Sequence, residues 1–97
     1  MNLVLPIGSV VRIKGVKGPV MIFGCLQQTA LRPGEIMDYV GVPYPIGNLN
    51  IQLQMGFQMT AIQEVIFEGY KGKEFEPLEK LLSLRLAQYI VRRELNV

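Results

Sequence analysis

Alternation of apolar and polar positions marks the first two β-strands of the chain. Over Val10–Lys14 the side chains alternate between an apolar and a more polar face, the period of a strand with one solvent-exposed side. The run Val20–Leu26 is apolar on both faces, which is typical of a strand inside a sheet. Gly15 and Gly18 enclose a two-residue tip and can supply the positive φ angles of a short hairpin loop. We therefore expect the two strands to pair.

Turn residues divide the chain between residues 27 and 68 into further short elements. Three more strands are expected, at Ile36–Val42, Leu49–Met55 and Ile62–Glu68. The connections between them are expected to be a loop at Gln27–Glu35, an exposed proline-rich turn at Pro43–Asn48 and a turn at Gly56–Ala61. Asp38 is the only charge in the third strand, and we expect it to pair with a nearby backbone or basic group.

The segment Leu49–Met55 has the most regular alternation in the chain. Its second face consists of the amides Asn50, Gln52 and Gln54. An uncharged, flat face of this kind protects poorly against pairing with another chain. The pattern leaves two interpretations open: an internal strand with a solvated face, or an edge strand offered to a partner. Tyr44, in the preceding turn, is a second candidate for contact with a partner.

The last segment changes to the period of an α-helix. Glu76 and Pro77 are typical of a helix start. At about 100° per residue, one face gathers Leu78, Leu82, Leu86 and Tyr89, and we expect this face to pack on the sheet. A second stripe, Leu84, Val91 and Leu95, lies nearly opposite. A helix with two apolar sides is rarely covered by one small sheet, so another polypeptide should cover this stripe.

These elements predict a single domain over residues 1–97, of mainly β, α+β class. About five short antiparallel strands over residues 4–70 should form a bent sheet or an SH3-like, partly open barrel, followed by one long helix at residues 76–95. The alternative is an open α+β layer with the helix laid across one face.

The composition argues against several classes of function and identifies none. The 97 residues carry a net charge of +2, no histidine and one cysteine, Cys25. The residues needed for a catalytic triad, a zinc site or a dense phosphate-binding stripe are missing. We expect no enzyme activity, no cofactor and no metal, and we expect Cys25 to be a buried small hydrophobe. No apolar run is long enough for a membrane span or a secretion signal, which predicts a cytoplasmic protein.

Four ordered blocks of the chain resemble a known family. They are Leu5–Val11, Val20–Gly24, Asp38–Asn48 and Ile62–Tyr70, and they are similar to the successive blocks of a small family of domains of unknown function. Its members are encoded beside type VIIb (ESX-like) secretion genes in Gram-positive bacteria. The resemblance implies a cytoplasmic accessory, targeting or chaperone-like protein that binds the helical N-terminal region of a secreted LXG or WXG toxin. It implies no catalytic or ligand-binding residues.

The leading prediction is thus a non-enzymatic protein that binds a helical protein partner. The residues expected to contact that partner are Leu84, Val91, Leu95, Asn50, Gln52, Gln54 and Tyr44. Self-association through the helix would bury the same stripe and remains an alternative. A different class of function, a small nucleic-acid-binding barrel, would use Arg12, Lys14, Lys17 and Tyr44.

Overall fold

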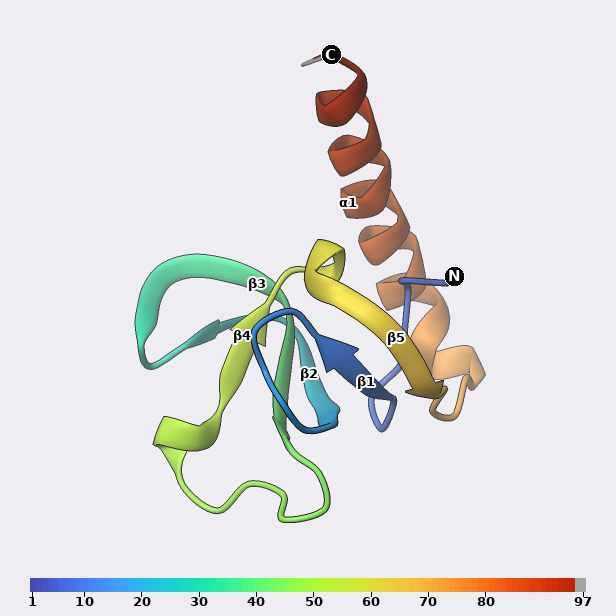
Figure 1. Ribbon diagram of the computed structural model, residues 1–97. Helices are drawn as coiled ribbons and strands as arrows, with labels where there is room; N and C mark the ends of the chain where they lie inside the picture. Colours follow the sequence, from blue (N-terminus) through green and yellow to red (C-terminus); the bar gives the residue numbers. More distant parts are fainter. Residues whose placement is uncertain (96–97) are drawn as a thin grey trace.

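A bent, open antiparallel sheet followed by one long helix forms the domain (Figure 1). The computed structural model describes residues 1–95, with side chains through Arg92. The sheet has five strands in the order β4-β3-β2-β1-β5, so β4 and β5 are its two edges. This confirms the predicted α+β fold. The strands are β1 (Val10–Ile13), β2 (Val20–Thr29), β3 (Arg32–Pro43), β4 (Met55–Phe57) and β5 (Ile62–Phe67), and the helix is α1 (Glu76–Leu95).

The predicted hairpin of β1 and β2 is present. The two strands pair antiparallel, with Val10 opposite Met21. Gly15 has the expected positive φ of 85°, whereas Gly18 does not take a positive φ. On its other side, β1 pairs antiparallel with β5, the last strand of the sheet in the sequence. β1 therefore lies between β2 and β5, and these three strands contribute residues to one apolar core although β5 is distant in the sequence.

The loop expected at Gln27–Glu35 is instead a continuation of two strands. β2 runs on to Thr29 and β3 starts at Arg32, so a tight connection joins them. Pairing extends outward through Gln27 opposite Met37 and Thr29 opposite Arg32. The prediction was wrong because this part of the hairpin projects beyond the core, where backbone pairing does not need apolar side chains on either face.

The strand expected at Leu49–Met55 is also wrong. The structure has an extended loop and a 3-10 turn at Ile51–Leu53. Strand β4, at Met55–Phe57, takes in the last residue of the predicted strand and the first two residues of the predicted turn Gly56–Ala61. A second 3-10 turn follows at Met59–Ala61. The side chain of Asn50 caps the first 3-10 turn by accepting a hydrogen bond of 2.9 Å from the backbone N–H of Gln52. This local bond competes with strand pairing, and the alternating Leu49 and Ile51 stay exposed.

Helix α1 packs on the sheet through the face that its periodicity predicts. Leu82 is fully buried, and Leu78, Leu86 and Tyr89 are partly buried against the core. The last turns of α1 extend past the sheet (Figure 1). None of the helices in residues 1–95 is long and apolar enough to cross a lipid bilayer. The core consists of Val4, Leu5, Val11, Ile13, Val20, Ile22, Cys25, Tyr39, Phe57, Met59, Ile62, Phe75 and Leu82.

Candidate binding surface

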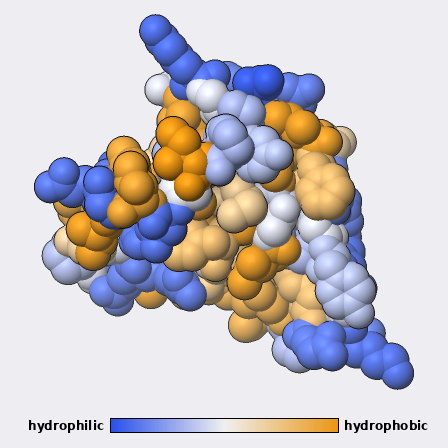
Figure 2. Space-filling view, turned by 90° about the horizontal axis from the view of Figure 1, so that it is seen from below, coloured by the Kyte–Doolittle hydropathy of each residue, from blue (hydrophilic) through white to orange (hydrophobic). Residues whose placement is uncertain are grey.

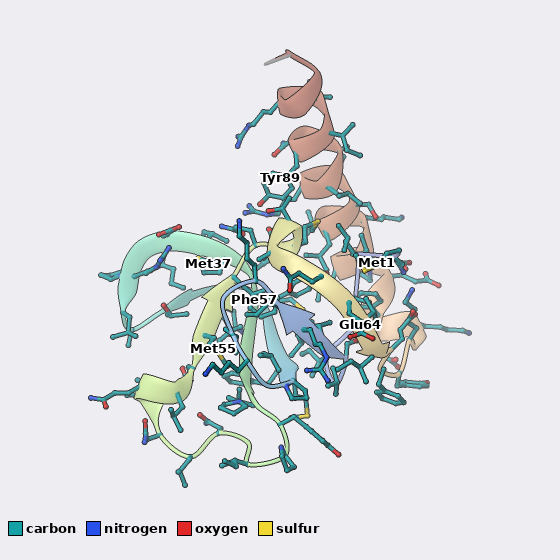
Figure 3. All side chains as sticks on the ribbon, viewed as in Figure 1. Met1, Met37, Met55, Phe57, Glu64 and Tyr89 are labelled. Atoms are coloured by element: carbon teal, nitrogen blue, oxygen red, sulfur yellow. The ribbon has the colours of Figure 1, made fainter. Side chains whose placement is uncertain are left out.

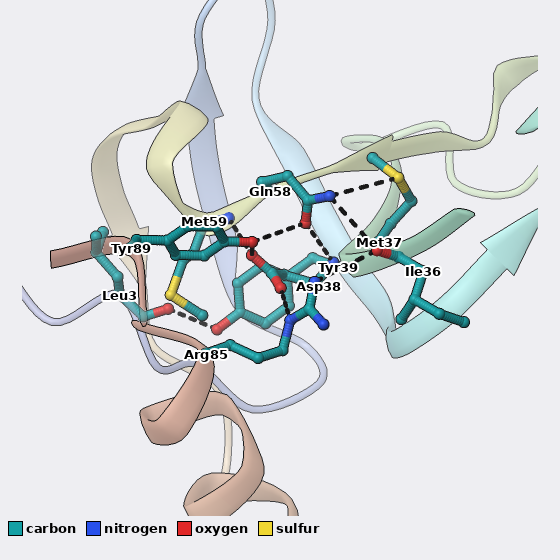
Figure 4. Close-up of polar contacts among 9 residues, drawn as sticks. All are labelled: Leu3, Ile36, Met37, Asp38, Tyr39, Gln58, Met59, Arg85 and Tyr89. Atoms are coloured by element: carbon teal, nitrogen blue, oxygen red, sulfur yellow. Dashed lines mark hydrogen bonds and ion pairs between the residues drawn. The ribbon is translucent and has the colours of Figure 1, made fainter. Parts of the chain in front are cut away.

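A buried carboxylate on β3 fixes helix α1 to the sheet (Figure 4). Asp38 is fully buried. Its Oδ2 accepts hydrogen bonds from the backbone N–H of Met59 at 2.8 Å and from the hydroxyl of Tyr89 at 2.9 Å. Its Oδ1 accepts from Nε of Arg85. The expectation that Asp38 pairs with backbone and basic groups is therefore confirmed, and both of its oxygens are engaged.

The contacts in this network raise the pKa values of two of its members. The hydrogen bond to Asp38 raises the pKa of Arg85, and burial together with Asp38 raises the pKa of Tyr89. Gln58 adds a further link, because its Oε1 accepts from the backbone N–H of Asp38 at 2.9 Å. Figure 3 shows Tyr89 on the side of α1 that faces the sheet. The network ties α1, β3 and the second 3-10 turn together and thereby sets the rotation of α1 about its own axis.

A second polar anchor fixes the N-terminal segment. The hydroxyl of Tyr39 donates to the carbonyl oxygen of Leu3 at 2.5 Å and accepts from the backbone N–H of Leu5 at 2.8 Å. Burial raises the pKa of Tyr39 and raises the pKa of Cys25 to about 11. Cys25 is buried, as the sequence predicts. Burial thus favours the protonated form of both groups.

The rotation of α1 leaves an apolar face uncovered. Leu84 is 62% exposed, Val91 52% and Leu81 52%. A shallow hollow runs along this face, lined by Leu84, Ala87, Gln88, Val91 and Arg92. The structure thus brings the predicted partner residues Leu84 and Val91 together on one accessible surface. The side chain of Leu95, the third predicted residue, lies outside the part that the structure describes.

The other predicted partner residues lie elsewhere. Tyr44, Asn50, Gln52 and Gln54 belong to the connection between β3 and β4, at the end of the molecule remote from the C-terminus of α1 (Figure 1). The amide side chains make local bonds, including one of 3.1 Å from Nε2 of Gln54 to Oδ1 of Asn48. They form no strand edge, so that interpretation is wrong, and no single surface unites them with Leu84 and Val91.

Sequence reasoning missed a second apolar surface, on the sheet. Tyr44, which is 53% exposed, borders a hollow with Met21, Ile66 and Phe67. Apolar side chains also gather on the face of the molecule seen from below in Figure 2. The available signal was the adjacent pair Ile66 and Phe67, because adjacent strand residues point to opposite faces and both remain largely exposed.

The basic residues proposed for nucleic-acid binding are only partly available. Nε of Arg12 lies 3.1 Å from Oε1 of Glu64 on the neighbouring strand β5. Tyr44 lines the apolar hollow described above. Lys14 and Lys17 remain exposed at the hairpin. Within the described residues, no group of three or more His, Cys, Asp or Glu side chains could hold a metal ion.

Comparison with known proteins identifies the family. Residues 4–78 match the family model described as a domain of unknown function, DUF4176. The chain belongs to this family. The DUF4176 match covers the complete sheet and ends in the first turn of α1, so the exposed face of α1 lies beyond it. No curated protein and no solved structure matches the chain.

Proposed function

We propose that this DUF4176 domain is a non-enzymatic accessory or chaperone-like protein of a type VIIb secretion system. It acts in the cytoplasm, where it binds a helical region of a secreted LXG- or WXG-type toxin before export. The observation that carries the proposal is the uncovered apolar face of α1 around Leu84 and Val91. The secretion context rests on the resemblance of the four sequence blocks to the family encoded beside such genes.

The geometry of α1 suits a helical partner. Leu84 and Val91 are both exposed on it, and the hollow that they line can receive a side chain from a second helix. Burying a large aliphatic side chain contributes about 1.5–3 kcal/mol, so a few such residues can support a specific complex. A helix laid against an apolar groove is a common form of protein recognition.

The polar groups of the domain favour binding over catalysis. Asp38 has both oxygens occupied by structural hydrogen bonds, and Tyr39 and Cys25 are buried in the core. A general base or nucleophile must reach a substrate. The buried polar groups of Asp38 and Tyr39 form their hydrogen bonds with the domain's own backbone and side chains.

Co-purification with a toxin tests the proposal. The double variant Leu84→Glu, Val91→Glu should lose capture of an LXG toxin encoded next to this protein, since charges would enter the contact. Leu31→Glu is the matched control: Leu31 is 68% exposed at the tip of the β2–β3 hairpin, and this variant should retain capture. Circular dichroism should show folded protein in both cases. Capture that survives the double substitution would show that this face of α1 is not the contact.

A further inference from the structure

The exposed face of α1 has the spacing of a helix-pair interface. Leu81, Leu84, Gln88 and Val91 follow one another at steps of three, four and three residues. These are the a and d positions of a heptad, which face a partner helix when two helices pack side by side. We call these four residues the α1 seam. All four are exposed, while the residues that dock α1 on the sheet lie on another side of the helix.

Between Lys80 and Arg92, the borders of the α1 seam carry only positive charge. The positions that flank a seam, e and g, are Lys80, Arg85, Ala87 and Arg92. Arg85 is partly neutralised by its bond to Asp38. Lys80 and Arg92 are exposed, and neither forms an ion pair with another of the side chains described through Arg92. One free cation therefore borders each side of the seam.

This charge pattern disfavours a parallel pair with a second copy of the same chain. In a parallel pair, g positions face e positions of the other helix, so Lys80 would meet Arg85 of the second copy. In an antiparallel pair, e positions face e positions and g positions face g positions, so Arg85 would meet Arg92 of the second copy, whereas Lys80 would meet Glu94, the next g position of the sequence. Like charges that face each other across an interface oppose association. The complementary surface is a seam with negative borders.

We propose that the α1 seam binds a partner helix whose own apolar a and d positions are flanked by glutamates or aspartates. This inference rests on the proposed function and specifies the chemistry of its partner. Apolar contact at Leu81, Leu84 and Val91 supplies the burial. Lys80 and Arg92 select the partner by charge, as flanking residues do in helix pairs.

Two synthetic helical peptides test the charge selection. Each has roughly three heptads with leucine at a and d; one carries glutamate at every e and g position and the other carries lysine. The wild-type domain should bind the acidic peptide at least about tenfold more tightly than the basic one. Raising the salt from about 0.05 M to 0.5 M should reduce the difference, because salt screens exposed charges.

Charge-reversed variants test whether Lys80 and Arg92 cause the preference for the acidic peptide. Lys80→Glu with Arg92→Glu should invert the peptide preference. Lys14→Glu with Lys17→Glu makes the same change in net charge at the β1–β2 hairpin and should leave the preference intact. The inference is overturned if the two peptides bind alike, if neither binds, or if the hairpin variant shifts the preference as strongly as the seam variant.

The two proposals fail in different ways. If toxin capture is lost in the Leu84→Glu, Val91→Glu variant but the peptides are not discriminated, the proposed function stands and the charge selection is wrong. If toxin capture survives that variant, the proposed function itself is wrong, whatever the peptides do.

Discussion

Arg85 on α1 donates a hydrogen bond from Nε to Oδ1 of Asp38 on β3, a residue 47 positions earlier in the chain. Asp38 is fully buried, whereas the side chain of Arg85 is 31% exposed. A buried ion pair often adds little net stability compared with an apolar replacement, but losing one partner is costly. Its main consequence here is geometric: with Tyr89, it determines which side of α1 faces the sheet and which side stays free.

Asp38→Ala should destabilise the domain strongly. The substitution leaves the Met59 backbone N–H and Nε of Arg85 without their acceptor, for a loss of about 3–5 kcal/mol in the free energy of unfolding. Urea denaturation measures it. Glu64→Ala is the control, because it breaks the exposed Arg12–Glu64 pair, worth about 0–1 kcal/mol. Equal losses in the two variants would contradict the structural role of Asp38.

Truncation of two leucines on α1 should change the stability of the domain by very different amounts. Leu82 is fully buried and Leu84 is 62% exposed, although both occupy the same helix. Leu82→Ala should lower the free energy of unfolding by about 2–5 kcal/mol, and Leu84→Ala should change it by no more than about 0.5 kcal/mol. Thermal or urea unfolding of the isolated domain makes the comparison. A large loss in Leu84→Ala would mean that the domain itself covers this face.

Close packing at Gly41 predicts a further contrast. Gly41 lies in β3, where an added Cβ would overlap Cγ1 of Val20 and crowd the ring of Phe57. Gly41→Ala should therefore cost about 1–3 kcal/mol through overpacking. Gly18→Ala is the matched control, since nothing lies within 4 Å of its added Cβ and its φ is not positive. Chemical denaturation should separate the two variants clearly; similar values would argue against tight packing of β3 on β2.

Cys25 predicts a loss of stability in alkaline solution. Burial raises the pKa of its thiol from 9.0 to about 11. A raised pKa means that the folded state holds the proton more firmly. The corresponding stability is therefore fully present below pH 9.0 and is lost as the pH rises toward about 11. The free energy of unfolding, measured across this range, should fall by on the order of 2 kcal/mol.

The variant Cys25→Ala isolates this contribution. It removes the thiol, so its unfolding free energy should depend less on pH than that of the wild type between pH 9.0 and about 11. Burial also raises the pKa of Tyr39 above its ordinary value of 10.0, so some decline in stability should remain at the upper end of this range. An unchanged slope in Cys25→Ala would exclude the thiol as the source.

Sequence patterns predicted those elements whose stability comes from repeated apolar contacts. The alternation at Val10–Lys14 and the two-sided apolar run at Val20–Leu26 correspond to β1 and the start of β2, and the helical period that starts at Glu76 corresponds to α1. The same logic failed at Leu49–Met55, where a perfect alternation is overruled by the Asn50 cap and the absence of a core to cover Leu49 and Ile51. Local periodicity does not report whether a partner surface is within reach.

The sequence by itself thus determined the class of fold, the place of the helix and the presence of two apolar stripes along it, because these follow from residue spacing alone. Only the tertiary structure decided which polar contacts hold the buried stripe in place. Those contacts depend on Asp38, a single charge in a strand, meeting Arg85 and Tyr89 from the far end of the chain. Burying a carboxylate requires several hydrogen bonds at once, and such a convergence of distant residues exists only when the whole domain is folded.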